Sequence, residues 1–343
     1  MIVLAFFGIL VISVNYKNKN FSSAPINSST PATTKADISA GTPLSESDLP
    51  ILTFAVISDI HIRSSATALE HFVGALTDLT VNMQPKPDTI VLNGDLGDGT
   101  TDDYALLRSI IKKMRLNTEG NPLWFATIGN HEFYNAYYEP LNNSWSPGTF
   151  PNGDTDEKAV ERFVTFSQRE RVYTDAYLKG YHFIFLGSEK SAMSDKNIGE
   201  SAYLSSAQLS WLEEKLKENY IPGKPIFVFL HQTLFNRTGE IGGYVIQAEQ
   251  LNNILKKYPE IILFSGHLHL LLGSQATVMH NVFTIYNDSS TYCPISPDFK
   301  SFYGKSEGLY IEVFEDKIEV KGRDFINKTW IFENAIPVKL GEK

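Results

Sequence analysis

Five short groups of residues in this sequence contain side chains of the types that bind divalent metal ions in proteins. In chain order, the groups are Asp59-Ile60-His61, Gly94-Asp95, Gly129-Asn130-His131-Glu132, His231 and Gly266-His267-Leu268-His269. Hard and borderline divalent ions prefer carboxylate, imidazole and amide oxygen ligands. Two such ions about 3.5–4 Å apart can hold a hydroxide between them and bind the oxygens of a phosphoryl group. The residue types therefore indicate hydrolysis of a phosphate ester by a metal-bound hydroxide.

Taken one at a time, most of these groups have an ordinary structural explanation. Asp and His are common at strand ends, Gly-Asp is typical of turns, and a single histidine such as His231 is usually a buried residue with a hydrogen-bond partner. Gly-Asn-His-Glu and Gly-His-Leu-His are much rarer combinations. Because five of the eight histidines fall within the groups, we infer that the groups belong to one site.

Each group follows an apolar run that has the pattern of a buried β-strand. The strands predicted in this way are 52–58, 89–92, 123–128, 181–186, 225–230, 261–264 and 282–286. Helical patterns lie between several of them, at 66–80, 104–114, 206–219 and 247–257. This alternation predicts an α/β layered fold, in which the carboxyl ends of strands bring binding residues to one edge. Glycines before Asp95, Asn130 and His267 are expected to allow the turns that aim these side chains inward.

The first 50 residues differ in composition from the rest of the chain. Residues 1–20 contain an almost wholly apolar run, 2–14, which is too short for a membrane span and fits a signal peptide or short anchor. Residues 21–50 are rich in Ser, Thr, Pro, Ala and Asn, which predicts a disordered linker. Lys17 and Lys19 follow the run and oppose export. We expect an extracytoplasmic protein, secreted or membrane-anchored; the alternative is a cytoplasmic one with 2–14 as a buried strand.

Residues 51–343 are expected to form one folded domain that ends with an additional β-hairpin over 309–320. The chain has 343 residues, a formal net charge of −9 and one cysteine, Cys293, which excludes an internal disulfide. The acidic charge disfavours bulk binding to nucleic acid, since that affinity depends on clustered Lys and Arg. A small phosphorylated substrate is compatible with the charge, because bound metal ions can reverse it locally.

The order of the five groups, from residue 52 to about 270, resembles that of the calcineurin-like metallophosphoesterases. The resemblance implies a four-layer αββα sandwich of two mixed β-sheets flanked by helices, with a two-metal site at one edge. It implies that the first ion is held by Asp59, His61, Asp95 and His269. It implies that the second is held by Asp95, Asn130, His231 and His267, with Asp95 bridging the two. The ions would be Mn²⁺, Fe²⁺ or Fe³⁺, or Zn²⁺, all of which accept this ligand set.

The resemblance also implies that His131 is catalytic without binding metal, either stabilising the transition state or protonating the leaving oxygen. General acid catalysis needs a positioned proton donor, and histidine is the commonest one. Asp95 is the other residue to which we assign a catalytic part, through the metal ions that it would bridge. The substrate itself, and whether it is a diester or a monoester, does not follow from the motifs.

Two departures from related groups narrow the resemblance. Purple acid phosphatases carry a tyrosine ligand where this chain has Asp98 and a glycine where it has His61. The motifs are more similar to those of the bacterial branch that contains class III cyclic-nucleotide phosphodiesterases. Serine/threonine protein phosphatases are the alternative among enzymes, although the arginine that follows their Gly-Asp-x-x-Asp block is replaced here by Gly99. A surface domain that holds metals without catalysis is the alternative outside enzymes, and the complete ligand set argues against it.

Several residues beside the motifs have weaker interpretations. The segment 133–150 is rich in aromatic residues, which could stack on a nucleobase, fill an apolar pocket or pack the loop onto the domain. Asp98 and the acidic residues after it are interpreted as capping the next helix. Glu132 is expected to orient a metal ligand. Arg63 is expected to form a surface salt bridge.

Overall fold

The computed structural model describes residues 49–139, 144–236, 241–242 and 244–338. All of them belong to the second of two compact units, which begins at Leu44. The expected signal or anchor segment, residues 1–20, and nearly all of the expected linker lie outside the described residues. Within the described ranges, no helix is both long and apolar enough to cross a membrane.

Two six-stranded sheets contain the described strands. The order in the first is β12 (Thr329–Pro337), β11 (Lys317–Asp324), β10 (Glu307–Val313), β1 (Leu52–Ile57), β2 (Thr89–Asn93) and β3 (Leu123–Thr127). The order in the second is β4 (Thr174–Leu178), β5 (Tyr181–Phe185), β6 (Ile226–Phe229), β7 (Ile261–Ser265), β9 (Thr284–Asn287) and β8 (Val278–His280). The neighbouring strands β1, β2 and β3 of the first sheet pair in parallel, and so do β5, β6, β7 and β9 of the second. Antiparallel strands complete both sheets. Both sheets are therefore mixed.

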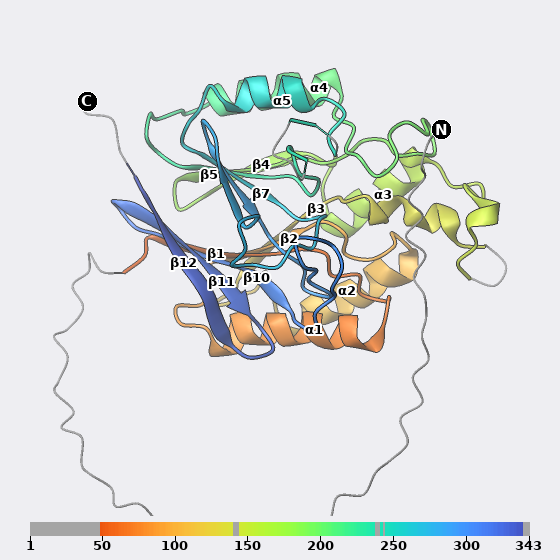
Figure 1. Cartoon of the computed structure of the whole chain (residues 1–343), viewed down its shortest axis with the longest axis horizontal. Coiled ribbons are helices and arrows are strands. Elements are labelled where there is room, and N and C mark those ends of the chain that lie inside the picture. The colour runs from red at the N-terminus through yellow and green to blue at the C-terminus, as the bar shows by residue number, and fades with distance from the viewer. Residues whose placement is uncertain (1–48, 140–143, 237–240, 243, 339–343) are drawn as a thin grey trace, which may run out of the picture. The chain divides into compact units, whose positions relative to one another are not determined.

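Helices cover the outer face of each sheet, so that the sheets lie between two helical layers (Figure 1). The first sheet carries α1 (Ala66–Thr77), α2 (Thr101–Lys113) and α3 (Asp156–Ser167), and the second carries α4 (Ser206–Lys217) and α5 (Ala248–Leu255). A π-helical segment (Asp78–Asn82) extends α1, and short 3₁₀ helices occur at His131–Tyr137 and Pro147–Thr149. Four of the five α-helices begin at a Ser or Thr whose side chain accepts a bond from a first-turn N–H.

The apolar core has three layers, because each sheet is buried on both faces. In β1, Phe54 and Val56 face the second sheet, whereas Ala55 and Ile57 belong to the cluster under α1 and α2. Phenylalanines fill the space between the sheets, and Phe54 meets four of them with ring centroids 4.8–6.2 Å apart. Strands buried on both faces need apolar residues at successive positions, which explains the unbroken apolar runs of the sequence.

The expected αββα sandwich of two mixed sheets is confirmed. The seven predicted strands each begin within two residues of the observed ones. The sequence patterns missed α3 and the strands β4, β8 and β12, and the three strands all lie at sheet edges. Edge strands are partly exposed and mix polar with apolar residues, so they lack the continuous apolar pattern.

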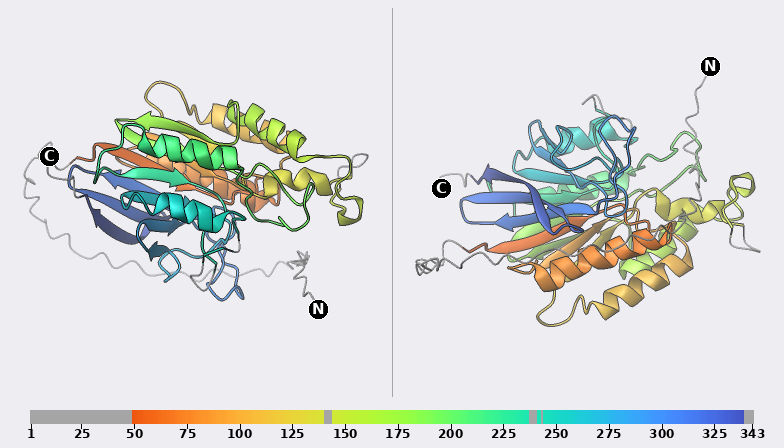
Figure 2. Two further views of the ribbon diagram at one scale, coloured as in Figure 1. Left: turned by 90° about the horizontal axis from the view of Figure 1, so that it is seen from above. Right: turned by 60° about the horizontal axis from the view of Figure 1, so that its bottom comes forward.

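The C-terminal hairpin differs from the expected addition at the end of a domain. Its strands β10 and β11 pair antiparallel around the turn at 314–316. However, β10 also pairs with β1, so the hairpin is part of the first sheet. The blue C-terminal strands accordingly lie beside the orange β1 in both views of Figure 2. A third strand, β12, continues the sheet to its edge.

Candidate metal centre

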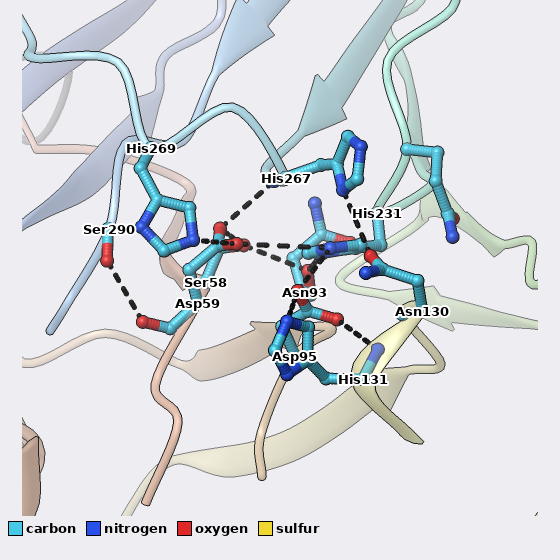
Figure 3. Close-up of polar contacts among 12 residues, drawn as sticks. Ser58, Asp59, Asn93, Asp95, Asn130, His131, His231, His267, His269 and Ser290 are labelled. Atoms are coloured by element: carbon cyan, nitrogen blue, oxygen red, sulfur yellow. Dashed lines mark hydrogen bonds and ion pairs between the residues drawn. The ribbon is translucent and has the colours of Figure 1, made fainter. Parts of the chain in front are cut away.

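The eight residues singled out from the sequence lie together where strands of both sheets end. They follow β1, β2 and β3 in the first sheet and β6 and β7 in the second. Figure 3 shows the labelled side chains pointing toward one another across the gap between these strand ends. The residues brought together are Asp59, His61, Asp95, Asn130, His131, His231, His267 and His269. Parallel strands place their carboxyl ends at one edge, which is why residues far apart in sequence meet here.

Five of these residues have a left-handed backbone, which is uncommon for residues other than glycine. Their φ angles are between 46° and 68°, at Asp59, His61, Asp95, His267 and His269. Backbone hydrogen bonds between the loops after β1 and β2 hold the first three in place: the N–H groups of Ile60 and His61 both donate to the carbonyl of Asp95. Backbone of this kind persists where the surrounding structure enforces it, and it is concentrated at functional sites.

The glycines of the motifs serve two different purposes. Gly94 has a φ of 82°, so it provides the turn expected of it. Gly266 and Gly129 are not in the left-handed region and instead allow close approach. A Cβ on Gly266 would lie 1.9 Å from Ser58 Oγ, and one on Gly129 would lie 2.2 Å from Asp95 Oδ1. The expectation of a turn is therefore wrong for these two glycines, which are required for space.

Two adjoining groups of ligand atoms form the centre. In the first, His269 Nε2 lies 2.9 Å from Asp59 Oδ1 and 3.2 Å from His61 Nε2. In the second, His231 Nε2 lies 3.1 Å from Asp95 Oδ2. Ligands about 2.1 Å from one ion, at tetrahedral to octahedral angles, lie roughly 3.0–3.4 Å apart. The observed separations therefore suit a shared ion in each group.

Asn130 and His267 complete the second group. Asn130 Oδ1 lies 3.0 Å from His267 Nδ1, and the ligand atoms of Asp95, His231 and His267 lie within 4.8 Å of one another. The two groups adjoin, since Asp59 Oδ1 of the first is 3.9 Å from His231 Nε2 of the second. Two ions held in this way would be close enough to act on one phosphoryl group.

Two atoms of the centre favour a bound cation directly. Asp59 Oδ1 and His231 Nε2 are buried and make no hydrogen bond of acceptable geometry within the described part of the chain, although the first faces His269 Nε2 at 2.9 Å and the second faces Asp95 Oδ2 at 3.1 Å. An unpaired buried polar atom costs about 1–3 kcal/mol. His231 Nδ1 donates to the carbonyl of Asn93 at 2.8 Å, so Nε2 is the ring nitrogen that faces the site, and it carries the lone pair when the ring is neutral. A divalent cation would pair both atoms, and the donor set fits one.

The pKa values of these residues are set by their burial and by one another's charges. Burial acts to raise the pKa of Asp95, but His231 and His131 outweigh it and hold that pKa well below its usual value. Burial and the charge of His131 lower the pKa of His61 to about 3, and burial with His231 lowers the pKa of His267 to about 3. The carboxylate is therefore ionised and these two imidazoles are neutral, which are the forms that coordinate metals. Asp95 and Asp59 raise the pKa of His231 to about 10 despite its burial, and Asp59 raises the pKa of His269, so each of these two imidazoles would release a proton when a cation binds.

His131 stands beside the ligands in a different environment. Its Nδ1 lies 2.8 Å from Asp98 Oδ1, whose other oxygen accepts a hydrogen bond from Tyr138 at 2.7 Å. Its Nε2 lies 4.0 Å from Asp95 Oδ2. Burial acts to lower the pKa of His131, but Asp95 and Asp98 raise it to about 9. The side chain therefore carries a proton at neutral pH, with Nδ1 fixed by Asp98 and Nε2 on the side of Asp95.

Asp98 binds His131 and does not cap the next helix, whereas the capping expected of the acidic residues after it is confirmed for Asp103. The cap of α2 is made by Thr100 and Asp103, each accepting a backbone N–H of the other residue. Asp98 lies within 4.8 Å of ligand atoms of His61 and His131 and binds the latter. The direction of the Asp98 side chain depends on the turn after β2, and no sequence pattern indicates that direction.

Buried polar residues behind the ligands hold the loops in position. Glu132 accepts hydrogen bonds from the backbone N–H groups of Asp95, Leu96 and Gly129 at 2.6–3.0 Å. Thus it fixes the backbone of a ligand rather than its side chain. Asp288, in the loop after β9, accepts a hydrogen bond from Asn93, and burial raises its pKa to about 8. Such supporting contacts determine where the ligand atoms point.

The loop after β9 also reaches the first metal group. Ser290 Oγ donates to the carbonyl of Asp59 at 3.0 Å, as Figure 3 shows, and Ser58 Oγ donates to the Asp59 carboxylate at 2.5 Å. No signal in the sequence identified these serines, because a hydroxyl near a strand end is common. Ser58 and the backbone N–H of His267 both donate to Oδ2, so Oδ1 is the carboxylate oxygen without a hydrogen bond of this kind.

The aromatic segment after His131 packs chiefly on itself. The ring of Tyr137 stacks on Trp145 and on Phe150, with centroids 4.9 and 4.5 Å apart. Tyr134 lies against the ring of His131 at 4.0 Å. The aromatic segment therefore forms a wall beside the centre.

Arg63 lies 3.3 Å from Asp102, so the expected salt bridge is present.

Comparison with known proteins places this site in a family. A family model described as calcineurin-like phosphoesterase matches residues 52–271. The chain belongs to this family. As a calcineurin-like phosphoesterase it is a metal-dependent hydrolase of phosphoric esters, and the resemblance inferred from the motifs is confirmed.

Two relatives of this phosphoesterase are similar in sequence along much of the chain. A probable glycerophosphodiester phosphodiesterase, GpdQ, of Arcobacter nitrofigilis is 24% identical over 224 residues, which cover 62% of this chain and 70% of the relative. A manganese-dependent ADP-ribose/CDP-alcohol diphosphatase of Xenopus tropicalis is 21% identical over 335 residues, covering 82% and 94%. Both names refer to hydrolysis at a phosphate group.

Solved structures agree with the fold. A dimetal phosphatase from Danio rerio superposes with a TM-score of 0.55 at 12% identity, over 84% of this phosphoesterase and 100% of the other chain. The purple acid phosphatase PPD1 from yellow lupin has the same TM-score and identity, over 85% and 55%. At these identities the likeness concerns the arrangement of sheets and helices alone.

Proposed function

We propose that this phosphoesterase hydrolyses a small phosphodiester, using two divalent ions held at the carboxyl ends of the strands. The first ion is assigned to Asp59, His61, Asp95 and His269, and the second to Asp95, Asn130, His231 and His267. The observation that supports the assignment best is that Asp59 Oδ1 and His231 Nε2, which are buried and make no hydrogen bond of acceptable geometry within the described residues, lie 3.9 Å apart in adjoining groups. When bound, the ions would lower the pKa of water and neutralise charge on the phosphoryl oxygens.

The residues of the chain itself supply position and a proton. Asp95 accepts the backbone N–H of His131 at 2.9 Å, so the ligand and the acid are held in one geometry. We assign to protonated His131 the transfer of a proton from Nε2 to the leaving oxygen, a role that suits a pKa raised to about 9. Asp98 positions the ring through Nδ1, in the way that a carboxylate fixes the tautomer of a catalytic histidine.

The substrate class is inferred from the two sequence relatives. One is named for glycerophosphodiesters, in which one phosphate joins two alcohols, and the other for ADP-ribose and CDP-alcohols, in which a diphosphate joins two groups. In both kinds of molecule each phosphorus carries a substituent besides the leaving group. This favours a diester over a monoester for the present chain. The name of the second relative specifies manganese, so we propose Mn²⁺ before iron or zinc.

Removal and restoration of metal tests the function directly. The full chain, stripped with a chelator, is expected to lose hydrolysis of bis-p-nitrophenyl phosphate and to regain it with Mn²⁺, because activation of the attacking water would depend on a bound cation. The measurement is kcat/KM for this diester and for p-nitrophenyl phosphate, beside the bound metal per chain. A higher value for the diester supports the proposed class. Stoichiometric metal without turnover of either substrate would contradict an enzymatic role.

We also propose that residues 2–14 direct the chain out of the cytoplasm, on the basis of their apolar run and the Ser/Thr/Pro-rich segment after it. A reporter that is active only outside the cytoplasm, fused after residue 50, is expected to be active. The matched control lacks residues 2–14 and should be inactive. Equal reporter activity with and without that segment, or cytoplasmic retention of both, would refute export through it.

A further inference from the structure

A small pocket adjoins the second metal group. Its volume is about 100 Å³, and it lies between the segment after His131 and the loop 188–201. Asn130, an assigned metal ligand, and Gln232, next in sequence to the ligand His231, both line it. An apolar cavity of about 150 Å³ holds a benzene molecule. The pocket therefore suits a group of a few non-hydrogen atoms, and it is too small for a purine base.

One wall of the pocket is aromatic. Phe133, Tyr134, Tyr137 and Phe150 line it, and the stacking of Tyr137 on Phe150 makes this wall rigid. The hydroxyl of Tyr134 accepts a bond from Asn130 Nδ2 at 3.3 Å and donates to Glu200 at 2.7 Å. Hence the wall is tied to a metal ligand on one side and to the opposite loop on the other.

The opposite side of the pocket carries two hydrogen-bond acceptors beside Lys190, whose Nζ lies over the ring of Tyr203. Gln232 is fully buried, its Nε2 donates to the carbonyl of Glu200 at 3.4 Å, and its Oε1 has no partner among the described residues. A buried acceptor without a partner is costly, and this one lies beside the metal centre. The exposed carboxylate of Glu200 also lines the pocket and has no ion pair within the described ranges. Both groups can accept a hydrogen bond from a ligand.

We infer that this pocket binds one alcohol of the phosphodiester, a small alcohol that carries hydrogen-bond donors. Its carbon atoms pack on the aromatic wall, its donors meet Gln232 and Glu200, and its phosphate reaches the metal centre past Asn130. The donors can be hydroxyl groups, as in glycerol, or an ammonium group, as in ethanolamine. This inference rests on the proposed function and adds the residues that select the substrate.

Methyl diesters of three alcohols test the pocket. They are methyl phosphoglycerol, methyl phosphoethanolamine and methyl propyl phosphate, which has no donor. With the Mn²⁺-loaded full chain, kcat/KM from ³¹P NMR is expected to be about tenfold or more higher for at least one donor-bearing diester than for the propyl one, because the propyl group leaves a buried acceptor unpaired. A higher value for the ethanolamine diester identifies an ammonium ligand, and a higher value for the glycerol diester identifies a polyol.

Two variants test which residues of the pocket select the donor-bearing diesters. Gln232→Met, which keeps length and removes the acceptor, is expected to lower the ratio of the donor-bearing to the propyl diester about tenfold. Gln250→Met, an exposed glutamine on α5, is the matched control and should leave the ratio as it is. Glu200→Gln removes charge and keeps an acceptor for Tyr134. This variant is expected to lower the ratio of the ethanolamine to the glycerol diester in particular.

A binding measurement separates failure of the subsite from failure of the proposed function. Calorimetry with glycerol 1-phosphate, ethanolamine phosphate and propyl phosphate reports selection by the pocket even without turnover. Equal affinity for all three in the unmodified chain would overturn the subsite, whether or not Gln232→Met folds. Tighter binding of a donor-bearing phosphate without hydrolysis of any diester would support the subsite and count against the proposed function.

Discussion

Replacing Asp95 with asparagine is expected to lower kcat/KM by a factor of about 10³ or more. Asp95 Oδ2 lies 3.1 Å from His231 Nε2, while Oδ1 accepts the backbone N–H of His131. Asparagine is neutral and has one acceptor oxygen, so it cannot satisfy both contacts and bind a cation. Loss of several kcal/mol of metal-assisted stabilisation corresponds to this factor, since each 1.36 kcal/mol is tenfold. The measurements are kcat/KM for the diester and bound metal per chain.

The control for this variant is Asp316→Asn, in the exposed turn between β10 and β11. This control makes the same chemical change at a residue outside the motifs. It should leave kcat/KM and the bound metal per chain within a factor of about two. If Asp95→Asn kept its metal and its activity within tenfold, the assignment of Asp95 as a bridging ligand would be wrong. A fall in bound metal in parallel with activity would support it.

The parts of the fold that the sequence predicted are those in which one physical requirement dominates. β1, β2 and β7 are buried on both faces, so their apolar runs have no other explanation in a globular chain. The ligand groups were recognisable because metal coordination restricts residue type. The place of these groups at the strand ends then followed from the rule that binding sites lie at the carboxyl ends of parallel strands.

The parts that the sequence did not predict depend on contacts between distant segments. Asp98 lies beside His131 because the turn after β2 faces the segment after β3, and Asp288 meets Asn93 only because the two sheets pack against each other. Each contact requires only a polar residue at its position, and polar residues are common in loops. The same holds for β12, whose exposed side chains are consistent with either a loop or an edge strand.

The strained backbone of the centre connects the fold to the chemistry. Left-handed residues at Asp59, Asp95 and His269 are disfavoured in isolation, yet Glu132 and Ser290 supply hydrogen bonds to the backbone of two of these loops. The stability of the sheets therefore maintains ligand positions that the local sequence would not adopt. Cations at the assigned site would therefore bind to groups that are already assembled, which would limit the reorganisation required during catalysis.

His131→Ala is the second variant with a large expected effect, and the effect should depend on the leaving group. For an alkyl phosphodiester, kcat is expected to fall by about 10²–10⁴, the usual contribution of general acid catalysis. For a nitrophenyl ester the loss should be smaller, because nitrophenolate departs without a proton. The exposed His280 on β8 provides the control, since His280→Ala should change neither rate.

The pH dependence gives an independent readout of the same residue. Asp95 and Asp98 raise the pKa of His131 to about 9 despite its burial, so the acid is present below this pH and is lost as pH rises through it. Cations bound alongside would lower the pKa, which places the alkaline limb of kcat at or below about 9. Asp98→Asn removes a negative charge and should move that limb to lower pH. Equal losses for alkyl and nitrophenyl esters in His131→Ala, with an unchanged alkaline limb, would exclude proton donation and leave only electrostatic stabilisation.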